Sequence, residues 1–479
     1  MTERGGRMGS FFSAEWNWAD TMTIVLIRII SVLLLIVSCA WADPEPLKRL
    51  GKGGAPGSRE GFKDRKFTLT GEDVVVFVGQ ENLVRDQKSG ELEALLATGF
   101  REEKPRFRSM AWEADTVYQQ WRDLHFGSWK EQLKATGATV MIAQFGQMEA
   151  LDGVGRLAEF TSAYHRLLDQ YAMRTSKLVL LSPTPFEKPE APFAPDLTTA
   201  NGDVEAYVEA VRKIADQRGA VFVDLYTPLK DQVERLTKDG IHLHESGLRT
   251  VARIAGRSLV PQVKPSNRDA LLGAIVRKNQ LWFDCWRPAN WSFAYGDRVN
   301  QKYGKGAGGL PSLQGAFEDQ LKYVGLADER IHRLALGQIA GPLSLPKITP
   351  AHSEGEALSP EEQLKTFTIA DGYEVNLFAS EADGVVNPTQ FSWDEKGRLY
   401  VACSPGYPQS LASSKPQDYI LICEDTDKDG RADRSWKFAE GLTMVQGVEP
   451  GDGGVYVCDF DRLLHFRDTD GDEKADEKR

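Results

Sequence analysis

Two segments that lie far apart in the sequence carry residues suited to acid–base chemistry. Asp239 precedes His242 by three positions. At this spacing the carboxylate can accept a hydrogen bond from one imidazole nitrogen and leave the other nitrogen free to act as a base. The second segment is the valine-rich run 74–78, which leads through Gly79 to Glu81. If both segments end at the same edge of a sheet, Glu81 faces the Asp239–His242 pair.

The elements that must position these residues alternate between strands and helices from about residue 71 to 262. This alternation predicts an α/β domain with a parallel sheet covered by helices on both faces, and ligands bind at the carboxyl ends of such strands. We therefore expect Gly79, Gly146 and Asp239 to contribute to one site. The expected strands are 74–78, 138–145, 177–182 and 220–224, and the expected helices are 127–136, 154–174, 203–218 and 246–259.

Residues 71–262 resemble the SGNH (GDSL-type) hydrolases, a family with a flavodoxin-like parallel sheet. The resemblance is most specific in the segment 238–243, Lys-Asp-Gly-Ile-His-Leu, where Asp239 and His242 match the catalytic acid and base of the family. It implies ester hydrolysis by a serine nucleophile. It also implies a small ester or a carbohydrate as the ligand.

The other family motifs are altered in this chain. Gln80 and Glu81 stand where the family has aspartate and the nucleophilic serine, Ala114 stands at a glycine, and Met148 replaces the asparagine that stabilises the oxyanion. Loss of a serine nucleophile can lower kcat by about a million-fold. The resemblance assigns catalytic positions to Asp239, His242 and Glu81, and substrate-binding positions to Gly79, Asn82, Gly146 and Met148.

The C-terminal quarter contains two acidic repeats separated by 43 residues. Aspartates at alternate positions are typical of a Ca²⁺-binding loop. An EF-hand needs a glutamate at position 12, where this chain has Trp436 and Arg479, so Ca²⁺ binding in another kind of loop and a merely soluble acidic turn remain as alternatives. The predicted ligands are Asp425, Asp427, Asp429 and Asp433 in the first repeat, and Asp468, Asp470, Asp472 and Asp476 in the second.

The same region predicts short strands at the spacing of a β-propeller, with room for about two blades in residues 366–479. Residues 367–380 and 394–401, with both acidic repeats, resemble the start of the propeller in planctomycete-type membrane-bound dehydrogenases, which are similar to glucose/sorbosone dehydrogenases. There is no C-x-x-C-H motif for haem c. A truncated gene product, or a partner chain that completes the propeller, would explain so few blades. The expected strands are 373–378, 390–393, 399–403, 419–423, 454–458 and 463–466.

These patterns leave several functions open. The first is an exported ester hydrolase that acts on extracellular carbohydrate or other esters and is impaired by the loss of serine. A variant of it uses Glu81 and His242 to activate water. The alternatives are a non-catalytic carbohydrate-binding module and a piece of a membrane-bound sugar dehydrogenase.

Composition and the N-terminus restrict the partners and the location. The 479 residues carry a net charge of −11, which argues against a nucleic-acid surface. The apolar run 29–37 and the Ala-Trp-Ala sequence that ends at residue 42 predict an export signal in residues 1–42, and Cys39 is an alternative lipid-attachment site. We expect a linker at 43–70 and an aromatic-rich helical connector at 263–365. The start codon could be Met1, Met8 or Met22.

Overall fold

A computed structural model of the chain describes residues 60–122, 125–190, 194–260, 267–306, 312–345, 358–408 and 415–479. The predicted signal segment, the lipid-attachment site at Cys39 and most of the predicted linker lie outside these residues. Within the described ranges, no helix combines the length and the apolar character needed to cross a bilayer.

The first part of the fold is an α/β domain built on a parallel sheet of five strands in the order β2-β1-β3-β4-β5. This is the flavodoxin-like order, and it agrees with the α/β class predicted from the sequence. The strands are β1 (Val74–Gly79), β2 (Arg106–Ser109), β3 (Val140–Gln144), β4 (Leu178–Leu181) and β5 (Val221–Val223).

Alternate residues of the central strands enter two separate apolar cores. Val74, Val76 and Val78 of β1 pack into one core, and Val75 and Phe77 pack into the other. All six residues of β1 are buried, as expected for a strand covered on both faces. This is why the sequence shows a continuous apolar run at 74–78 rather than an alternating pattern.

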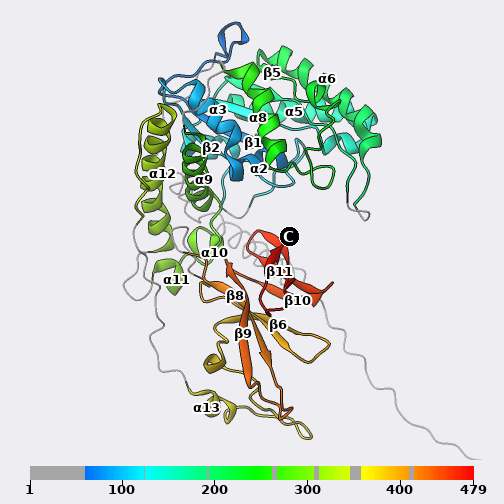
Figure 1. Cartoon of the computed structure of the whole chain (residues 1–479). Helices are drawn as coiled ribbons and strands as arrows, with labels where there is room; N and C mark the ends of the chain where they lie inside the picture. The colour runs from blue at the N-terminus through cyan, green and yellow to red at the C-terminus, as the bar shows by residue number, and fades with distance from the viewer. Residues whose placement is uncertain are drawn as a thin grey trace, which may run out of the picture. The chain divides into compact units, whose positions relative to one another are not determined.

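Helices cover both faces of the sheet (Figure 1). Residues of α4, α5 and α6 contribute to the first core, and residues of α2, α3 and α8 contribute to the second. The bounds are α2 (Glu81–Ser89), α3 (Glu91–Gly99), α4 (Trp129–Thr136), α5 (Leu157–Ala172), α6 (Asn201–Arg218), α7 (Tyr226–Leu229) and α8 (Glu245–Leu259). Short 3₁₀ turns lie at Lys63–Arg65, Glu149–Asp152, Val154–Arg156 and Thr198–Ala200.

Two long helices follow the domain, α9 (Arg268–Trp286) and α12 (Leu313–Ala335). They run side by side in Figure 1, and residues of both belong to the cores of the α/β domain. Trp282 and Trp286 of α9 are almost completely buried there. The aromatic cluster of this segment therefore packs largely as core. Two short helices, α10 (Trp291–Ala294) and α11 (Lys302–Lys305), lie between α9 and α12.

The C-terminal residues form two antiparallel sheets of four strands each, in the orders β6-β7-β8-β9 and β10-β11-β12-β13. They share an apolar cluster that includes Tyr400 and Ile420 from the first sheet and Val448 and Val457 from the second. The bounds are β6 (Pro388–Trp393), β7 (Leu399–Cys403), β8 (Asp418–Glu424), β9 (Arg434–Leu442), β10 (Gly447–Gly451), β11 (Gly454–Asp459), β12 (Arg462–Arg467) and β13 (Glu477–Lys478). The short helices α13 (Pro360–Leu364) and η6 (Glu381–Asp383) precede the first sheet.

The strand predicted at 373–378 is wrong. This segment pairs with no strand of the described chain, and Tyr373 is 79% exposed. Its apolar residues suggested a strand, but a strand also needs a partner for its backbone groups. The remaining predicted strands of this region lie within β6, β7, β8, β11 and β12.

Candidate active site

The N-terminus of α2 places Glu81 at the carboxyl end of β1. Gly79 ends the strand with φ of 137°, and a Cβ atom there would lie 2.2 Å from the carbonyl oxygen of Gln144 on β3. Only glycine accommodates this close approach and this backbone angle. The chain then turns at Gln80 and starts α2 at Glu81, whose side chain is 24% exposed. A carboxylate in the first turn of a helix is favoured by the helix dipole.

Asp239 and His242 lie in the loop that precedes α8. His242 Nδ1 is 2.5 Å from Asp239 Oδ2, and the backbone N–H of His242 donates to Asp239 Oδ1 at 2.8 Å. Gly240 between them has φ of 93°, and a Cβ atom there would lie 2.4 Å from the carbonyl oxygen of Glu187. The aspartate therefore holds both the ring and the backbone of His242, and it directs Nε2 away from itself.

The ionised form of Asp239 is favoured by its hydrogen bonds. Partial burial opposes ionisation, but the N–H groups of His242 and Ile241 and the imidazole of His242 outweigh it and lower the pKa of Asp239. An ionised Asp239 accepts from Nδ1–H, so the lone pair of a neutral imidazole lies on Nε2.

His242 Nε2 faces Glu81. The distance from Nε2 to Glu81 Oε1 is 3.7 Å, and Arg85 Nε donates to the same oxygen at 2.8 Å from the next turn of α2. The structure therefore brings together the three residues assigned to catalytic positions, Asp239, His242 and Glu81. Within the described residues, no hydroxyl or thiol hydrogen-bonds to Nε2, the atom that would activate a nucleophile in acyl transfer.

The sequence analysis gave no role to Glu149, a buried carboxylate that organises the loops beside this site. It accepts hydrogen bonds from Gln80 Nε2 at 2.8 Å, from the backbone N–H of Gly146 at 2.9 Å and from that of Val117 at 2.9 Å. Burial raises the pKa of Glu149, and these hydrogen bonds partly offset the rise. An aspartate at position 80 would place a second carboxylate against Glu149, whereas the amide of Gln80 donates to it. In the sequence, the one indication that Glu149 binds these loops is that it follows Gly146 by three positions.

The residues assigned to substrate binding differ in their hydrogen-bond partners and in their exposure. Asn82 Nδ2 donates to Thr184 Oγ1 at 3.0 Å, and Gln147 Nε2 donates to the same hydroxyl at 3.0 Å, so both amides bind within the protein. The N–H of Gly146 is bound to Glu149, and Met148 is 38% exposed. Among the described residues, no hydrogen bond or ion pair joins Asn82, Gly146 or Met148 to His242. Gly79 serves as the turn that lets α2 begin.

In the loop after β2, Ala114 stands where the sequence resemblance implies a glycine, and it keeps a backbone conformation typical of glycine. Ala114 has φ of 60°, in the left-handed region that favours glycine. The backbone N–H of the nearby Trp112 donates to the carbonyl of Gly79 at 3.2 Å, which connects this loop to the end of β1. Glu113 pairs with Arg287 and Asp115 with Arg122, so ion pairs hold the loop on both sides of Ala114.

The acidic repeats form two compact clusters in the C-terminal sheets. The carboxylates of Asp425, Asp427 and Asp433 offer oxygen atoms within 4.8 Å of one another, and those of Asp468, Asp470 and Asp476 do the same. Asp429 and Asp472 belong to neither cluster; each accepts a backbone N–H two residues further along. The exposed aspartate triads could bind Ca²⁺, an ion that prefers oxygen ligands.

Comparisons with known proteins cover two parts of the chain. A family model described as a domain of unknown function (DUF7133) matches residues 359–479. No curated protein matches the chain.

Solved structures are similar over about 40% of the chain. BT4096, a gut microbial diltiazem-metabolizing enzyme, has 18% identity and a TM-score of 0.31, and the match covers 40% of this chain and 48% of BT4096. The chain thus spans about half of that protein. The acetyl xylan esterase AlAXEase has 16% identity and a TM-score of 0.31 over 39% of this chain and 100% of its own. A putative GDSL-like lipase from Parabacteroides merdae has 17% identity and a TM-score of 0.32 over 40% and 98%.

Proposed function

We propose that the α/β domain is an ester hydrolase by ancestry in which covalent acyl transfer is disabled. The observation that carries this proposal is the pairing of an intact Asp239–His242 dyad with a carboxylate at the nucleophile position. Glu81 Oε1 lies 3.7 Å from His242 Nε2, where a serine hydroxyl would be activated. Attack by a carboxylate on an ester carbonyl gives an anhydride, which returns to the starting ester more readily than it advances.

The ligand that we propose for this domain is a carbohydrate ester or another small ester, or the carbohydrate alone if the site only binds. The altered oxyanion motif supports low turnover. The side chain of Met148 has no N–H group to donate, and the side-chain amides of Asn82 and Gln147 donate to Thr184. Loss of a single oxyanion donor lowers kcat by about a hundred- to a thousand-fold. Simple acyl esters should therefore be hydrolysed weakly or not at all.

The test is to restore the missing nucleophile. The Glu81→Ser variant should react with a fluorophosphonate probe at residue 81 and should gain hydrolysis of 4-nitrophenyl acetate, because His242 can then take the hydroxyl proton. Wild type and Glu81→Ala should show neither property, and the double variant Glu81→Ser/His242→Ala should lose both. Probe labelling of the wild-type chain at a serine, or a folded Glu81→Ser variant that stays unlabelled, would contradict the proposal.

For the C-terminal region we propose two blades of a β-propeller, completed by further blades or by a partner chain. The support is that each sheet is a four-stranded antiparallel meander and that the two sheets share one apolar cluster. We also propose that the acidic loops bind Ca²⁺ weakly and that the protein is exported, as the sequence of residues 1–42 suggests. The similarity to sugar dehydrogenases stays a prediction.

A further inference from the structure

The geometry points to a second chemistry for the same site: Glu81 acts as a nucleophile toward a saturated carbon that carries a halide, and His242 activates the water that releases the product. This inference shares with the proposed function only the assignment of Glu81 and His242 to one site. It concerns a different bond, carbon–halogen instead of acyl–oxygen.

The first support is the state of the Glu81 carboxylate. Both of its polar contacts, with Arg85 Nε at 2.8 Å and with His242 Nε2 at 3.7 Å, are made by Oε1. Within the described chain, Oε2 accepts no hydrogen bond. The side chain is 24% exposed, so Oε2 can reach a ligand. A carboxylate with one oxygen held by Arg85 and the other free of hydrogen bonds can attack a ligand through the second oxygen.

The second support is the chemistry of carboxylates. Carboxylate side chains form covalent intermediates in several enzyme classes when the attacked atom is a saturated carbon. The product of such an attack is an ordinary ester, stable enough to persist and reactive enough to be hydrolysed. Glu81 is thus a poor nucleophile for acyl transfer and a suitable one for displacement at carbon.

The reaction balances with water as its only co-reactant. In the first step a lone pair of Glu81 Oε2 forms a bond to the primary carbon of an alkyl halide, and the carbon–halogen bond breaks to release a halide ion, which needs no proton. In the second step His242 Nε2 takes a proton from water, and the resulting hydroxide attacks Glu81 Cδ. The ester bond then breaks, and the alcohol leaves with the proton from His242. Glu81 remains as a carboxylic acid with one oxygen from water, and it releases its proton to solvent to regenerate the carboxylate, so that each turnover yields the alcohol, a halide ion and one proton.

The position of His242 fits the second step and not the first. Displacement needs only the Glu81 carboxylate, whereas hydrolysis needs a base close to it. His242 Nε2 lies 3.7 Å from Oε1, and Asp239 fixes the imidazole at 2.5 Å from the other side. Removal of the imidazole should therefore arrest the reaction after the first step, with the alkyl group still on Glu81.

The experiment traps this intermediate in the full chain. His242→Gln and wild type are incubated with 1-bromohexane, digested, and analysed by mass spectrometry for a hexyl group on the peptide that contains residue 81. We expect the adduct to accumulate on Glu81 in His242→Gln only. In ¹⁸O-labelled water, wild type should instead release bromide repeatedly and gain ¹⁸O in the Glu81 carboxylate only when the bromide is present. Glu81→Gln should lose the adduct, the ¹⁸O exchange and the bromide release.

A second glutamate in the same chain controls for non-specific alkylation. Glu159 also forms an ion pair with an arginine, Arg156, at 2.7 Å, but no histidine of the described residues forms an ion pair with it. A hexyl group found equally on Glu159 and Glu81, or no adduct on Glu81 in a His242→Gln variant that melts like wild type, would overturn the inference. The Glu81→Ser labelling result does not depend on this outcome, so the ester-hydrolase ancestry and the displacement chemistry can fail separately.

Discussion

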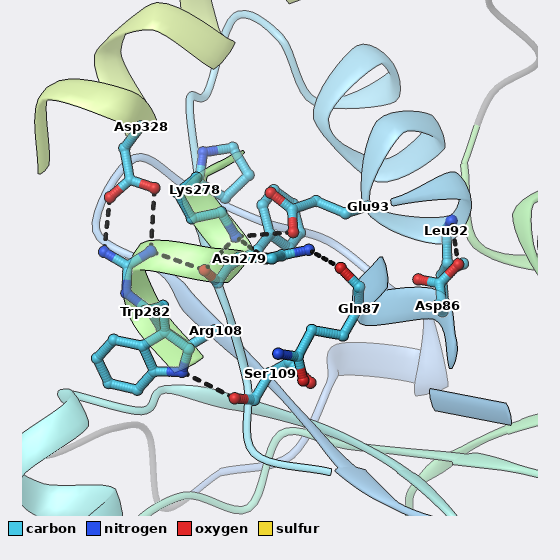
Figure 2. Close-up of polar contacts among 12 residues, drawn as sticks. Asp86, Gln87, Leu92, Glu93, Arg108, Ser109, Lys278, Asn279, Trp282 and Asp328 are labelled. Carbon is cyan, nitrogen blue, oxygen red and sulfur yellow. Dashed lines mark hydrogen bonds and ion pairs between the residues drawn. The ribbon is translucent and has the colours of Figure 1, made fainter. Parts of the chain in front are cut away.

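Lys278 Nζ lies 2.8 Å from Glu93 Oε2, and the side chains of this pair are 0% and 3% exposed (Figure 2). The ammonium group also donates to Asn279 Oδ1 at 2.7 Å and to the carbonyl of Phe107 at 3.0 Å, so its three protons all have acceptors. Lys278 lies on α9 and Glu93 lies on α3, so this ion pair connects α9 to the α/β domain. A second buried pair, Arg108 Nη2 to Asp328 Oδ2 at 2.6 Å, joins α12 to β2 in the same way.

Removal of one partner of the Lys278–Glu93 pair should destabilise the domain strongly. Lys278→Met leaves the Glu93 carboxylate buried without a cation, which typically costs about 3–5 kcal/mol of unfolding free energy. The double variant Lys278→Met/Glu93→Leu should recover most of this loss, because no uncompensated charge remains. Urea unfolding followed by tryptophan fluorescence measures both, since Trp282 lies on the same helix. Lys322→Met, which breaks the exposed pair with Asp319, is the control and should leave the midpoint unchanged.

We also predict that the α/β domain needs α9 and α12 to stay soluble. A chain that ends at residue 262 would expose the apolar surface that α9 covers and would leave Glu93 and Arg108 without their partners. A fragment of residues 60–262 should therefore aggregate, whereas a fragment of residues 60–345 should be monodisperse in light scattering. A 60–262 fragment that is soluble and melts cooperatively would show that the α/β domain does not need α9 and α12.

The strands that the sequence predicted correctly are marked by apolar residues within the strand itself. The apolar runs at 74–78 and 178–181 are buried on both faces, and burial alone explains them. Strand β2 was missed because it reads Arg-Phe-Arg-Ser, and two arginines in four residues suggest a surface loop. Arg108 is buried in an ion pair with Asp328, which lies far along the chain and forms two hydrogen bonds with it. No local pattern contains that partner.

The same distinction applies to the candidate site. The hydrogen bond between Asp239 and His242 spans three residues, so their spacing was sufficient to predict it. The contact between Glu81 and His242 depends on a sheet that brings distant segments to one edge, and the parallel order of the strands made it predictable. The use of Asn82 and Gln147 to bind Thr184 was not predictable, because it depends on the path of the loop after β4.

Lanthanide luminescence should detect cation binding at the second acidic loop. Trp436 Nε1 donates to the carbonyl of Glu473 at 2.8 Å, which places the indole against the loop that contains Asp468, Asp470 and Asp476. If the loop binds Ca²⁺, Tb³⁺ bound there should emit when tryptophan is excited, and added Ca²⁺ should quench the signal. Asp470→Asn should weaken binding on the order of tenfold through the loss of a charged ligand. Trp436→Phe should lower the emission without lowering the Ca²⁺ affinity, and emission that is insensitive to Asp470→Asn would exclude this loop.

The stability of the α/β domain should depend on pH through Asp86, a buried carboxyl on α2. Burial is the main cause that raises its pKa from 3.8 to about 7, and repulsion from Glu93 adds to the effect. Hydrogen bonds from the N–H of Leu92 at 3.1 Å (Figure 2) and from the hydroxyl of Ser89 at 3.3 Å act in the opposite direction. The folded state therefore holds a proton on Asp86 at pH values where the unfolded chain has lost it.

The sign of the effect follows from this difference in proton binding. Between about pH 4 and 7 the folded state binds more protons than the unfolded state, so the unfolding free energy falls as the pH rises, and the penalty is complete above pH 7. One pKa unit corresponds to about 1.4 kcal/mol, which gives a total on the order of 4 kcal/mol. Asp86→Asn removes the ionisation and keeps an acceptor for the N–H of Leu92. The urea midpoint of the variant should therefore rise relative to that of wild type from pH 4 to 7, and the difference should stay constant above pH 7. Asp269→Asn, at a side chain that is 99% exposed, should run parallel to wild type throughout. If the Asp86→Asn midpoints also run parallel to wild type, Asp86 is ionised in the folded protein at neutral pH and a counter-charge compensates its burial.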